Sequence, residues 1–541
     1  MKRIIYIIMF IPSLAICQTL CHTPAITQNQ LQDVCKLKGK KLPSINNAFF
    51  LKVYFHIIRR SNMTGGQTIS NVNDSFEILN NDFNPYNIYF VWDGTIDYID
   101  SDTYFYDINY NIFTYNNHNN GIDIYLTSNE VNTPGGLANG IGNGTEFYVG
   151  GQYWKPPYNN LAVSHCISHE MGHILNLWHT HHGTYNEGGN DTNQCAEYVD
   201  GTNSDVCGDY IEDTPADPCL QFNVDSSTGA WLGSGQDAHG SNYIPDTHLI
   251  MSYTDVNCMS YFSFQQAERM KNAIRYLPQL RATNMTISGS AFLCSQEVYT
   301  INNMPSEAMV LLNTNYSSSG FSIQVSSNLE IVSYSNGEVT VKKLSDGFGF
   351  IKVYYKGLLV DTHEIWVGGP VITNLYYIGG VIYTEAPIES DPFRFHWKIG
   401  NHNFWWREGR KQYPLQNGTY NVETYAENLS CGAGPVYTTQ IIVTDSHNFA
   451  LKKVDNNHII TLDPIDYSES PLPTEITTTY STSNIYYAYT LHNISTHEVV
   501  AKGKISSKGG TLNFSNICKG LYELFLITDF GNVESFKIQL K

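Results

Sequence analysis

The sequence predicts a multidomain protein in which an α+β domain is followed by β-sandwich modules. The length argues for several domains, because 541 residues exceed the roughly 100–200 residues that one hydrophobic core usually organises. Strand and helix periodicities alternate in the first half of the chain, up to Leu277-Pro278. Beyond that point the pattern changes to short alternating segments broken by glycine, asparagine and serine, which is typical of small β-sandwiches.

In the first half, the periodicity predicts a βαβ-like order of elements. We expect strands at 50–58, 86–92 and 121–126, and helices at 72–83, 161–177 and 263–276. A long Gly- and Asn-rich stretch that carries Cys195, Cys207 and Cys219 separates the last two helices. Loops of this length are usually functional, or are held by disulfides or ions.

The changes in pattern also predict the domain boundaries. The expected units are an N-terminal segment with the character of a propeptide at 18–48, the α+β domain at 49–282, β-sandwiches at 283–370 and 371–447, a Pro- and Thr-rich linker at 448–482, and a C-terminal β module at 483–541.

Charge and composition narrow the class of protein. The chain has 31 Lys and Arg residues against 50 Asp and Glu residues, which gives a net charge of −19. An acidic surface argues against nucleic acid or anionic lipid as the main partner. Only 15% of the residues are charged, and asparagine, serine, threonine and 38 tyrosines supply the remaining polarity. This mixture favours β-rich extracellular modules.

The N-terminus predicts export. Met1-Lys2-Arg3 is basic, and the apolar run from Ile4 to Ile16 suits a signal peptide and is too short to span a bilayer. We expect a signal peptide at 1–17 with cleavage before Gln18; a lipoprotein acylated at Cys17 is the alternative. No later run of 18 apolar residues occurs, so we expect no transmembrane span and a secreted or cell-surface location.

The helix predicted at 161–177 carries the residues that indicate a metal site. His169 and His173 are four residues apart, so their imidazoles share one helix face and can converge on a zinc ion at about 2.0–2.1 Å. Glu170 lies one residue further round the helix. Its carboxylate points elsewhere than the two rings, but it can reach a water at the ion and take its proton.

His179 is the expected third ligand, and it imposes a condition on the helix. It lies six residues beyond His173, which on a continuing helix would turn it about 240° away from the ligand face. The helix must therefore stop near 175–177. Asn176 is the residue there that most readily takes the left-handed conformation such a stop requires.

Three other histidines are expected to have no ligand role. His165 lies four residues before the first ligand, and three histidines at this spacing span about 12 Å of helix, which is too far for one ion. We expect His165 to pack or to hydrogen-bond near the site. His181 and His182 are expected to be loop residues.

The pattern His169-Glu170-x-x-His173-x-x-Asn176-x-x-His179 resembles the signature of the metzincin zinc peptidases, which have glycine at the position of the asparagine. Metzincins also have a methionine-containing turn below the metal. The segment Leu249-Ile-Met-Ser-Tyr253 is similar to it, with Met251 as the methionine. The first domain is therefore expected to be of the metzincin type.

Within the metzincins, the sequence resembles the pappalysin (cytophagalysin) family over about 49–280. That family has His-Thr at the third ligand, matched by His179-Thr180, and a Gly-Asp-x-x-x-Asp-Thr-Pro segment, matched by 208–215. It also has Cys-Met after the methionine turn, matched by Cys258-Met259. The resemblance implies a zinc-dependent endopeptidase that cleaves proteins or peptides.

The same resemblance implies roles for individual residues. Glu170 would be the general base, and Tyr253 would hydrogen-bond the oxyanion; a buried tyrosine that supports the turn is the alternative. Asp209 and Thr214 match positions that bind calcium in some members, with loop hydrogen bonding as the alternative.

The resemblance also bears on the cysteines. It implies a Cys219–Cys258 disulfide, which would leave Cys195 and Cys207 to pair with each other. For Cys21 and Cys35, in the segment 18–48, two interpretations stay open. They form a disulfide, or one of them ligates the zinc and keeps the enzyme latent.

The C-terminal modules have resemblances of their own. The sandwiches at 283–370 and 371–447 are similar to immunoglobulin-like domains of secreted bacterial proteins. The strands Gly520 to Ile527 and Phe536 to Lys541 resemble the sorting domain of type IX secretion cargo, which implies the secretion machinery as a partner; a third immunoglobulin-like module is the alternative.

A surface adhesin with a non-catalytic peptidase-like domain is the rival hypothesis for the whole chain. A domain that has lost its activity usually lacks a ligand or the base. The presence of Glu170 together with all three histidines therefore favours the enzyme.

Overall fold

The computed structural model describes residues 47–131, 135–151, 159–184, 195–305, 310–311, 320–378, 381–413, 415, 418–443, 449–454, 459–464, 486–506, 510–527 and 533–540. The predicted signal peptide and nearly all of the segment 18–48 lie outside these residues. Among the helices in the described part of the chain, none is long and apolar enough to cross a membrane. The chain forms two compact units. The first runs to Ser288 and takes in Thr300–Ile323 and Lys352–Thr362, and the second holds the rest.

A mixed sheet is the framework of the first unit. Its strands are β1 (Phe49–Arg59), β2 (Ile88–Val91), β3 (Ile96–Asp100), β4 (Ile122–Leu126), β5 (Gly136–Ala138) and β6 (Glu146–Val149). The order is β2-β1-β4-β6-β5, and β3 also pairs with β1. All pairs are parallel except β5 with β6. This parallel arrangement makes the first unit an α/β region, which corrects the predicted α+β class.

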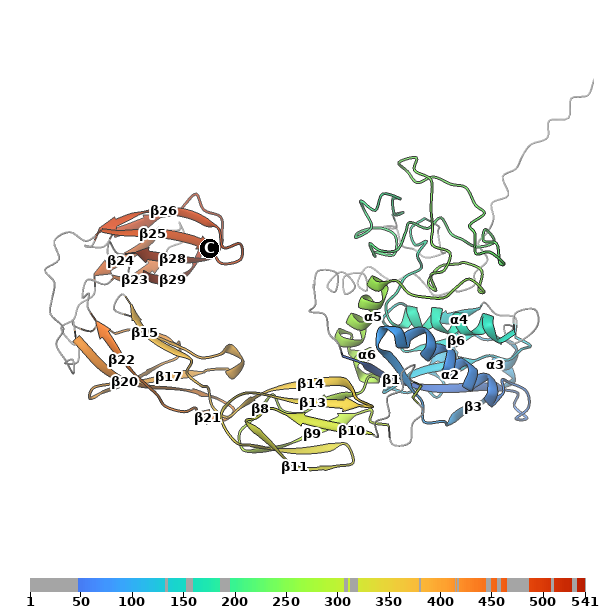
Figure 1. Cartoon of the computed structure of the whole chain (residues 1–541), viewed down its shortest axis with the longest axis horizontal. Helices are drawn as coiled ribbons and strands as arrows, with labels where there is room; N and C mark the ends of the chain where they lie inside the picture. Colours follow the sequence, from blue (N-terminus) through green and yellow to red (C-terminus); the bar gives the residue numbers. More distant parts are fainter. Residues whose placement is uncertain are drawn as a thin grey trace, which may run out of the picture. The chain divides into compact units, whose positions relative to one another are not determined.

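The helices of the first unit are α2 (Ile69–Phe83), α3 (Asp102–Tyr106), α4 (Asn159–Ile174), α5 (Phe264–Tyr276) and α6 (Pro278–Thr283). Helix α2 begins after Thr68, whose hydroxyl oxygen accepts a hydrogen bond from the backbone N–H of Asn71 (3.1 Å), and α5 begins after Ser263 with a capping box. Helices α2 and α4 pack against each other, and α4 also packs on β5 and β6 (Figure 1).

Strand alternation divides the core of this unit into two clusters. Val53, Phe55 and Ile57 of β1 join the larger cluster, which includes the buried residues of α2, α4 and α5. Ile58 of β1 and Tyr125 of β4 join a smaller cluster with Phe105 of α3. Because successive side chains of a strand point to opposite faces, α4 covers one face of the sheet and the smaller cluster lies on the other.

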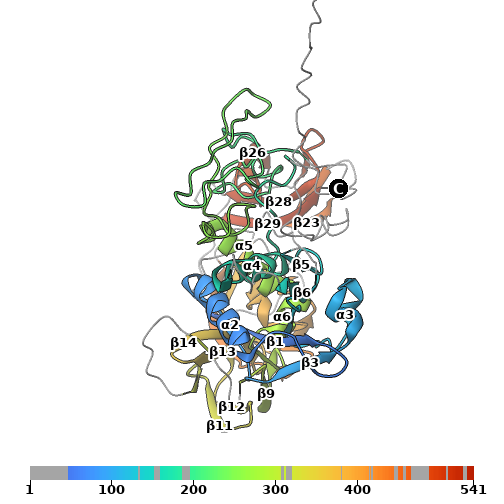
Figure 2. The ribbon, with the colours of Figure 1, turned by 90° about the vertical axis from the view of Figure 1, so that its right-hand side faces the viewer.

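The segment 195–262 reaches α5 without a named helix or strand in its described residues. In both views it lies on the side of α4 away from the sheet (Figures 1 and 2). Arg269 of α5 holds it by donating to the carbonyl oxygens of Asp209 and Tyr210, at 2.6 Å each. The predicted Cys195–Cys207 disulfide is present, with an S–S distance of 2.03 Å, and is confirmed.

The predicted Cys219–Cys258 disulfide is wrong, because the structure gives both residues as thiols. Cys219 has a left-handed backbone, with φ of 74°, and its N–H donates to Asp217 Oδ1 at 2.8 Å. The sulfur of Cys258 lies 4.0 Å from the carbonyl oxygen of Asp225. Each of the two cysteines therefore has its contacts in a turn of its own, and the two turns are not joined by a disulfide.

Three modules of mostly antiparallel strands follow. The first contains β7 (Thr286–Ser288), β8 (Phe292–Leu293), β9 (Gln296–Asn302), β10 (Phe321–Val325), β11 (Leu329–Ser335), β12 (Glu338–Lys343), β13 (Gly347–Tyr355) and β14 (Leu358–Val367). The second contains β15 (Asn374–Ile378), β16 (Val381–Glu385), β17 (Arg394–Ile399), β18 (His402–Trp406), β19 (Arg410–Gln412), β20 (Gly418–Asn428), β21 (Gly432–Ala433) and β22 (Tyr437–Val443).

The third module contains β23 (Phe449–Val454), β24 (Ile459–Pro464), β25 (Tyr486–Asn493), β26 (Val499–Ser506), β27 (Gly510–Asn513), β28 (Gly520–Ile527) and β29 (Val533–Leu540). Strands β23 and β24 fall inside the predicted linker 448–482. Because β24 pairs with β27, these residues belong to the last module and not to a linker. A second disulfide joins Cys294 to Cys431.

Candidate metal centre

The two histidines of α4 are oriented by backbone carbonyl oxygens. His169 Nδ1 lies 2.7 Å from the oxygen of Ile250, and His173 Nδ1 lies 2.8 Å from that of Leu177. A carbonyl oxygen only accepts hydrogen bonds, so each Nδ1 carries the proton. Each neutral ring then has its lone pair on Nε2, which is the arrangement of a histidine that binds a metal.

The end of α4 brings the third histidine to the first two. Asn176 has φ of 74°, which confirms the predicted left-handed residue. The N–H of Leu177 donates to the oxygen of Gly172 (2.9 Å), and the N–H of Asn176 donates to that of His173 (3.0 Å). These two bonds form a Schellman motif, which ends the helix and reverses the chain.

The reversed chain places His179 Nε2 3.1 Å from His169 Nε2 and 3.0 Å from His173 Nε2. All three rings are buried, with at most 4% exposed. A single proton on His179 Nε2 cannot form good hydrogen bonds to the Nε2 atoms of both other histidines. A cation between the three nitrogens can bind all of them. A tetrahedral ion with bonds of about 2.0–2.1 Å needs ligand atoms about 3.3–3.4 Å apart, close to the distances found. The histidine triad could therefore hold a metal ion.

Glu170 follows the first histidine of the triad on α4, and its side chain lies against the edge strand β5. Its side chain is buried, with 1% exposed. A Cβ atom added to Gly136 of β5 would lie 2.4 Å from Glu170 Oε1, so only glycine leaves room for this carboxylate. No sequence pattern selects Gly136, since Gly135-Gly136 indicates only a turn or loop.

The segment 249–253 supports the triad from below. The sulfur of Met251 packs against Gly172 of α4, and a Cβ atom added to this glycine would lie only 2.4 Å from it. The carbonyl oxygen of Met251 accepts a hydrogen bond from the N–H of Thr180 at 3.1 Å. The ring of Tyr253 is buried, and its centroid lies 4.7 Å from that of His179. The structure thus brings both predicted residues of this turn to the metal centre.

His181 is a residue that the sequence reasoning missed. It was expected in a loop, but its ring is fully buried, 5.0 Å from the ring of His179 and 4.4 Å from that of Tyr253. His182 packs on Trp178 at 4.3 Å. No spacing rule selects His181, because its position depends on the turn that follows the helix.

His165 lies outside the triad, as expected. Its Nδ1 is 3.2 Å from Asp82 Oδ2, and the hydroxyl of Ser168 donates to the same oxygen at 2.5 Å. Among the described residues, the group of potential metal ligands at this place consists of the three triad histidines and does not include His165. The residue is therefore a suitable control for the three ligands.

The predicted calcium residues meet in the segment 195–262. The hydroxyl of Thr214 lies 3.0 Å from both carboxylate oxygens of Asp209, which is buried. Burial raises the pKa of Asp209 to about 7. Burial, and then repulsion from Asp209 and Asp217, raises the pKa of Glu197 to about 8. The calcium site itself stays a prediction.

Comparisons with known proteins assign no family. No protein-family model matches the sequence, and no curated protein matches it. Similar solved structures include the FN1-FN3 domains of chicken CNTN1 (11% identity, 48% of this chain and 98% of that chain, TM-score 0.18). They also include InvD of Yersinia pseudotuberculosis (12%, 48% and 97%, TM-score 0.14) and fibronectin(III)-like modules of CbhA from Clostridium thermocellum (13%, 29% and 88%, TM-score 0.13). Scores this low carry no argument about this chain.

The left-handed turn gives the first prediction. Asn176→Gly keeps the metal at the triad, because glycine takes positive φ without strain, whereas Asn176→Val loses it, because a β-branched residue is strongly disfavoured there. Metal analysis after dialysis against metal-free buffer measures both. Equal metal retention in the two variants would show that the turn does not control the site.

The second prediction compares two histidines of the same segment. His179→Ala lowers the bound metal by one equivalent relative to the unaltered chain, because it removes one of three ligands. His165→Ala leaves the metal content unchanged, since its ring contacts Asp82 instead. Atomic absorption after dialysis decides, and an equal loss in both variants would contradict the assignment of ligands.

Proposed function

We propose that the chain is a secreted zinc-dependent endopeptidase of the metzincin type. The observation that carries the proposal is the convergence of three histidine Nε2 atoms at the end of α4, the helix that also carries the buried Glu170. A site that only stored a metal would have no need of a carboxylate outside the ligand set. Three protein ligands with one open position are typical of catalytic zinc.

The nature of the ligands supports zinc over other ions. Three neutral imidazole nitrogens suit zinc and disfavour calcium or magnesium, which prefer oxygen ligands. When bound, zinc supplies Lewis acidity, which polarises a peptide carbonyl and lowers the pKa of a water molecule. His169, His173 and His179 are the residues that would hold it.

Glu170 and Tyr253 supply the remaining chemistry. We assign the Glu170 carboxylate as the group that takes a proton from the attacking water and passes it to the nitrogen of the departing amine. Tyr253 would donate its hydroxyl proton in a hydrogen bond to the oxyanion that forms on the peptide carbonyl. The position of its ring beside His179 and His181 supports this role.

The edge of the sheet suggests how a substrate would bind. Strand β5 is the last strand in its order, and it lies against Glu170 through Gly136. An extended peptide can add to such an edge by backbone hydrogen bonds. This pairing would position a protein or peptide substrate along the metal centre with little demand on its side chains.

Export is part of the proposal. The two disulfides, Cys195–Cys207 and Cys294–Cys431, indicate an extracellular protein. We propose that a signal peptide at 1–17 directs export, and that the last module, with strands β28 and β29, is recognised by secretion machinery of the type IX kind.

Calcium is proposed as a second, structural ion near Asp209 and Thr214. Asp209 is buried against the hydroxyl of Thr214. Burial, and then repulsion from Asp209 and Asp217, raises the pKa of Glu197, and a cation at Asp209 would reduce that repulsion. Oxygen ligands of this kind suit calcium.

The calcium proposal gives the third prediction. Adding calcium to protein treated with a chelator raises the midpoint of thermal unfolding, because the ion binds only the folded state. Asp209→Asn abolishes the rise, and Asp200→Asn, at an exposed carboxylate of the same segment, preserves it. A midpoint that does not move on calcium addition to the unaltered chain would refute the calcium site.

The fourth prediction tests the enzyme against the adhesin. Glu170→Gln keeps the triad metal but lowers the cleavage rate of a denatured protein by about 10²–10⁴-fold, because the amide cannot accept the proton. Glu212→Gln, at an exposed site, keeps full activity. Sequencing of product termini measures cleavage. Full activity of Glu170→Gln would exclude the mechanism, and a zinc-loaded unaltered chain that cleaves nothing would favour the adhesin.

A further inference from the structure

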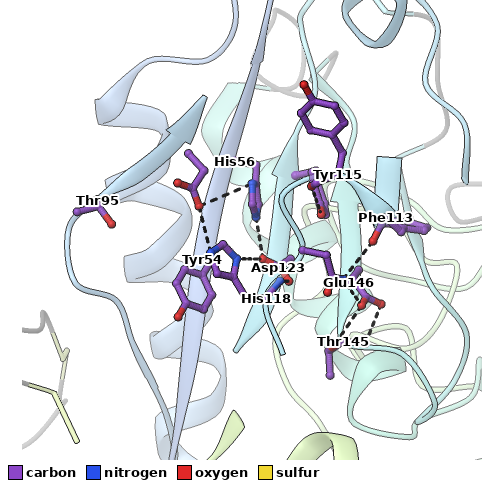
Figure 3. Close-up of polar contacts among 12 residues, drawn as sticks. Tyr54, His56, Thr95, Phe113, Tyr115, His118, Asp123, Thr145 and Glu146 are labelled. Carbon is purple, nitrogen blue, oxygen red and sulfur yellow. Dashed lines mark hydrogen bonds and ion pairs between the residues drawn. The ribbon is translucent and has the colours of Figure 1, made fainter. Parts of the chain in front are cut away.

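A second group of potential metal ligands lies on the face of the sheet opposite α4. His56 of β1 lies opposite Asp97 of β3. On β4 the residue opposite His56 is Tyr125, and Asp123 comes two residues before it. His118 belongs to the loop that precedes β4 (Figure 3). The side chains of His56 and Asp123 are fully buried, and those of His118 and Asp97 are 30% and 39% exposed.

Asp123 orients both histidine rings. Its Oδ1 lies 2.8 Å from His56 Nε2 and 2.7 Å from His118 Nδ1, and its Oδ2 accepts from the backbone N–H of His118 at 2.9 Å (Figure 3). A carboxylate accepts these bonds, so each of the two ring nitrogens carries a proton. The lone pairs of the neutral rings are then on His56 Nδ1 and His118 Nε2.

Those two nitrogens face the same carboxylate oxygen. Asp97 Oδ2 lies 4.0 Å from His56 Nδ1 and 3.7 Å from His118 Nε2, and the three ligand atoms lie within 4.8 Å of one another. His56 Nδ1 is buried and has no hydrogen-bond partner. A buried nitrogen with an unused lone pair is unfavourable, and a cation in this space would remove the penalty.

Aromatic contacts fix the planes of the rings. His118 stacks on Tyr54 with centroids 3.5 Å apart, and His56 stacks on Tyr125 at 4.3 Å. The two lone pairs therefore keep their directions. Only Asp97, at the partly exposed end of the group, has freedom to move toward them.

We propose that His56, His118 and Asp97 bind a divalent transition-metal ion, with Asp123 as the carboxylate that holds both histidines. Two imidazoles and one carboxylate suit zinc, and a carboxylate behind each ligand histidine is the usual supporting group. A zinc ion requires ligand atoms about 3.3–3.4 Å apart. The present distances to Asp97 therefore need to shorten by about half an ångström, which the partial exposure of Asp97 permits.

The role of this ion is structural. It lies across the sheet from the histidine triad, so the two ions cannot form a two-metal centre, in which the metals are about 3.5–4 Å apart. It links β1 to β3 and to the loop before β4. The site does not depend on peptidase activity, and it stands or falls separately from the proposed function.

Zinc binding to the full chain tests the proposal in the His179→Ala background, where the triad has lost a ligand. We expect this chain to bind one zinc ion after dialysis and zinc to raise its unfolding midpoint. Adding Asp97→Asn or His118→Asn lowers the zinc affinity at least about tenfold and abolishes the rise. Asp107→Asn, at an exposed carboxylate of the first unit outside the group, changes neither quantity.

Two results would overturn the site. One is a His179→Ala chain that binds no zinc, and the other is an Asp97→Asn chain that binds zinc as tightly as its parent. If His118→Asn fails to fold, as circular dichroism would show, Asp97→Asn decides alone, because its side chain is partly exposed and forms no buried hydrogen bond. The cleavage rate of the chain with an intact triad serves as an independent check, and we expect Asp97→Asn to leave it unchanged.

Discussion

The histidine triad depends on one constraint, which is that α4 must end between the second and the third histidine. A helix that continued would carry His179 to the far side, so the left-handed conformation of Asn176 decides whether three ligands meet. The Schellman bonds at Gly172 and His173 fix that ending. Two further contacts depend on the position that this turn gives to the third histidine: the N–H of Thr180 donates to the Met251 oxygen, and the ring of Tyr253 lies 4.7 Å from that of His179.

A second principle is the control of histidine tautomers by acceptors behind the rings. At the triad, backbone oxygens of Ile250 and Leu177 hold the proton on Nδ1 and leave Nε2 for a metal. At the second group, the buried carboxylate of Asp123 holds the proton on Nε2 of His56 and on Nδ1 of His118, which leaves His56 Nδ1 and His118 Nε2 for a metal. In each case the protein supplies fixed lone pairs before any ion arrives, which lowers the cost of binding.

The sequence predicted what is local and missed what depends on distant pairing. The spacing of His169, His173 and His179 follows from helix geometry alone, and so does the need for a turn at Asn176. Gly136 was missed because its contact with Glu170 joins an edge strand to a helix far along the chain. The linker boundary was wrong for the same reason, since β24 is recognised as part of the last module only by its pairing with β27. Likewise, His56, Asp97 and Asp123 lie on three different strands, so only sheet register brings them together.

The central claim is that the three histidines hold one ion, and anomalous X-ray scattering at the zinc edge tests it most directly. Crystals of the full chain grown with zinc should show a peak at about 2.0–2.1 Å from Nε2 of His169, His173 and His179. A refined structure with the three rings in place and no anomalous peak between them would contradict the account.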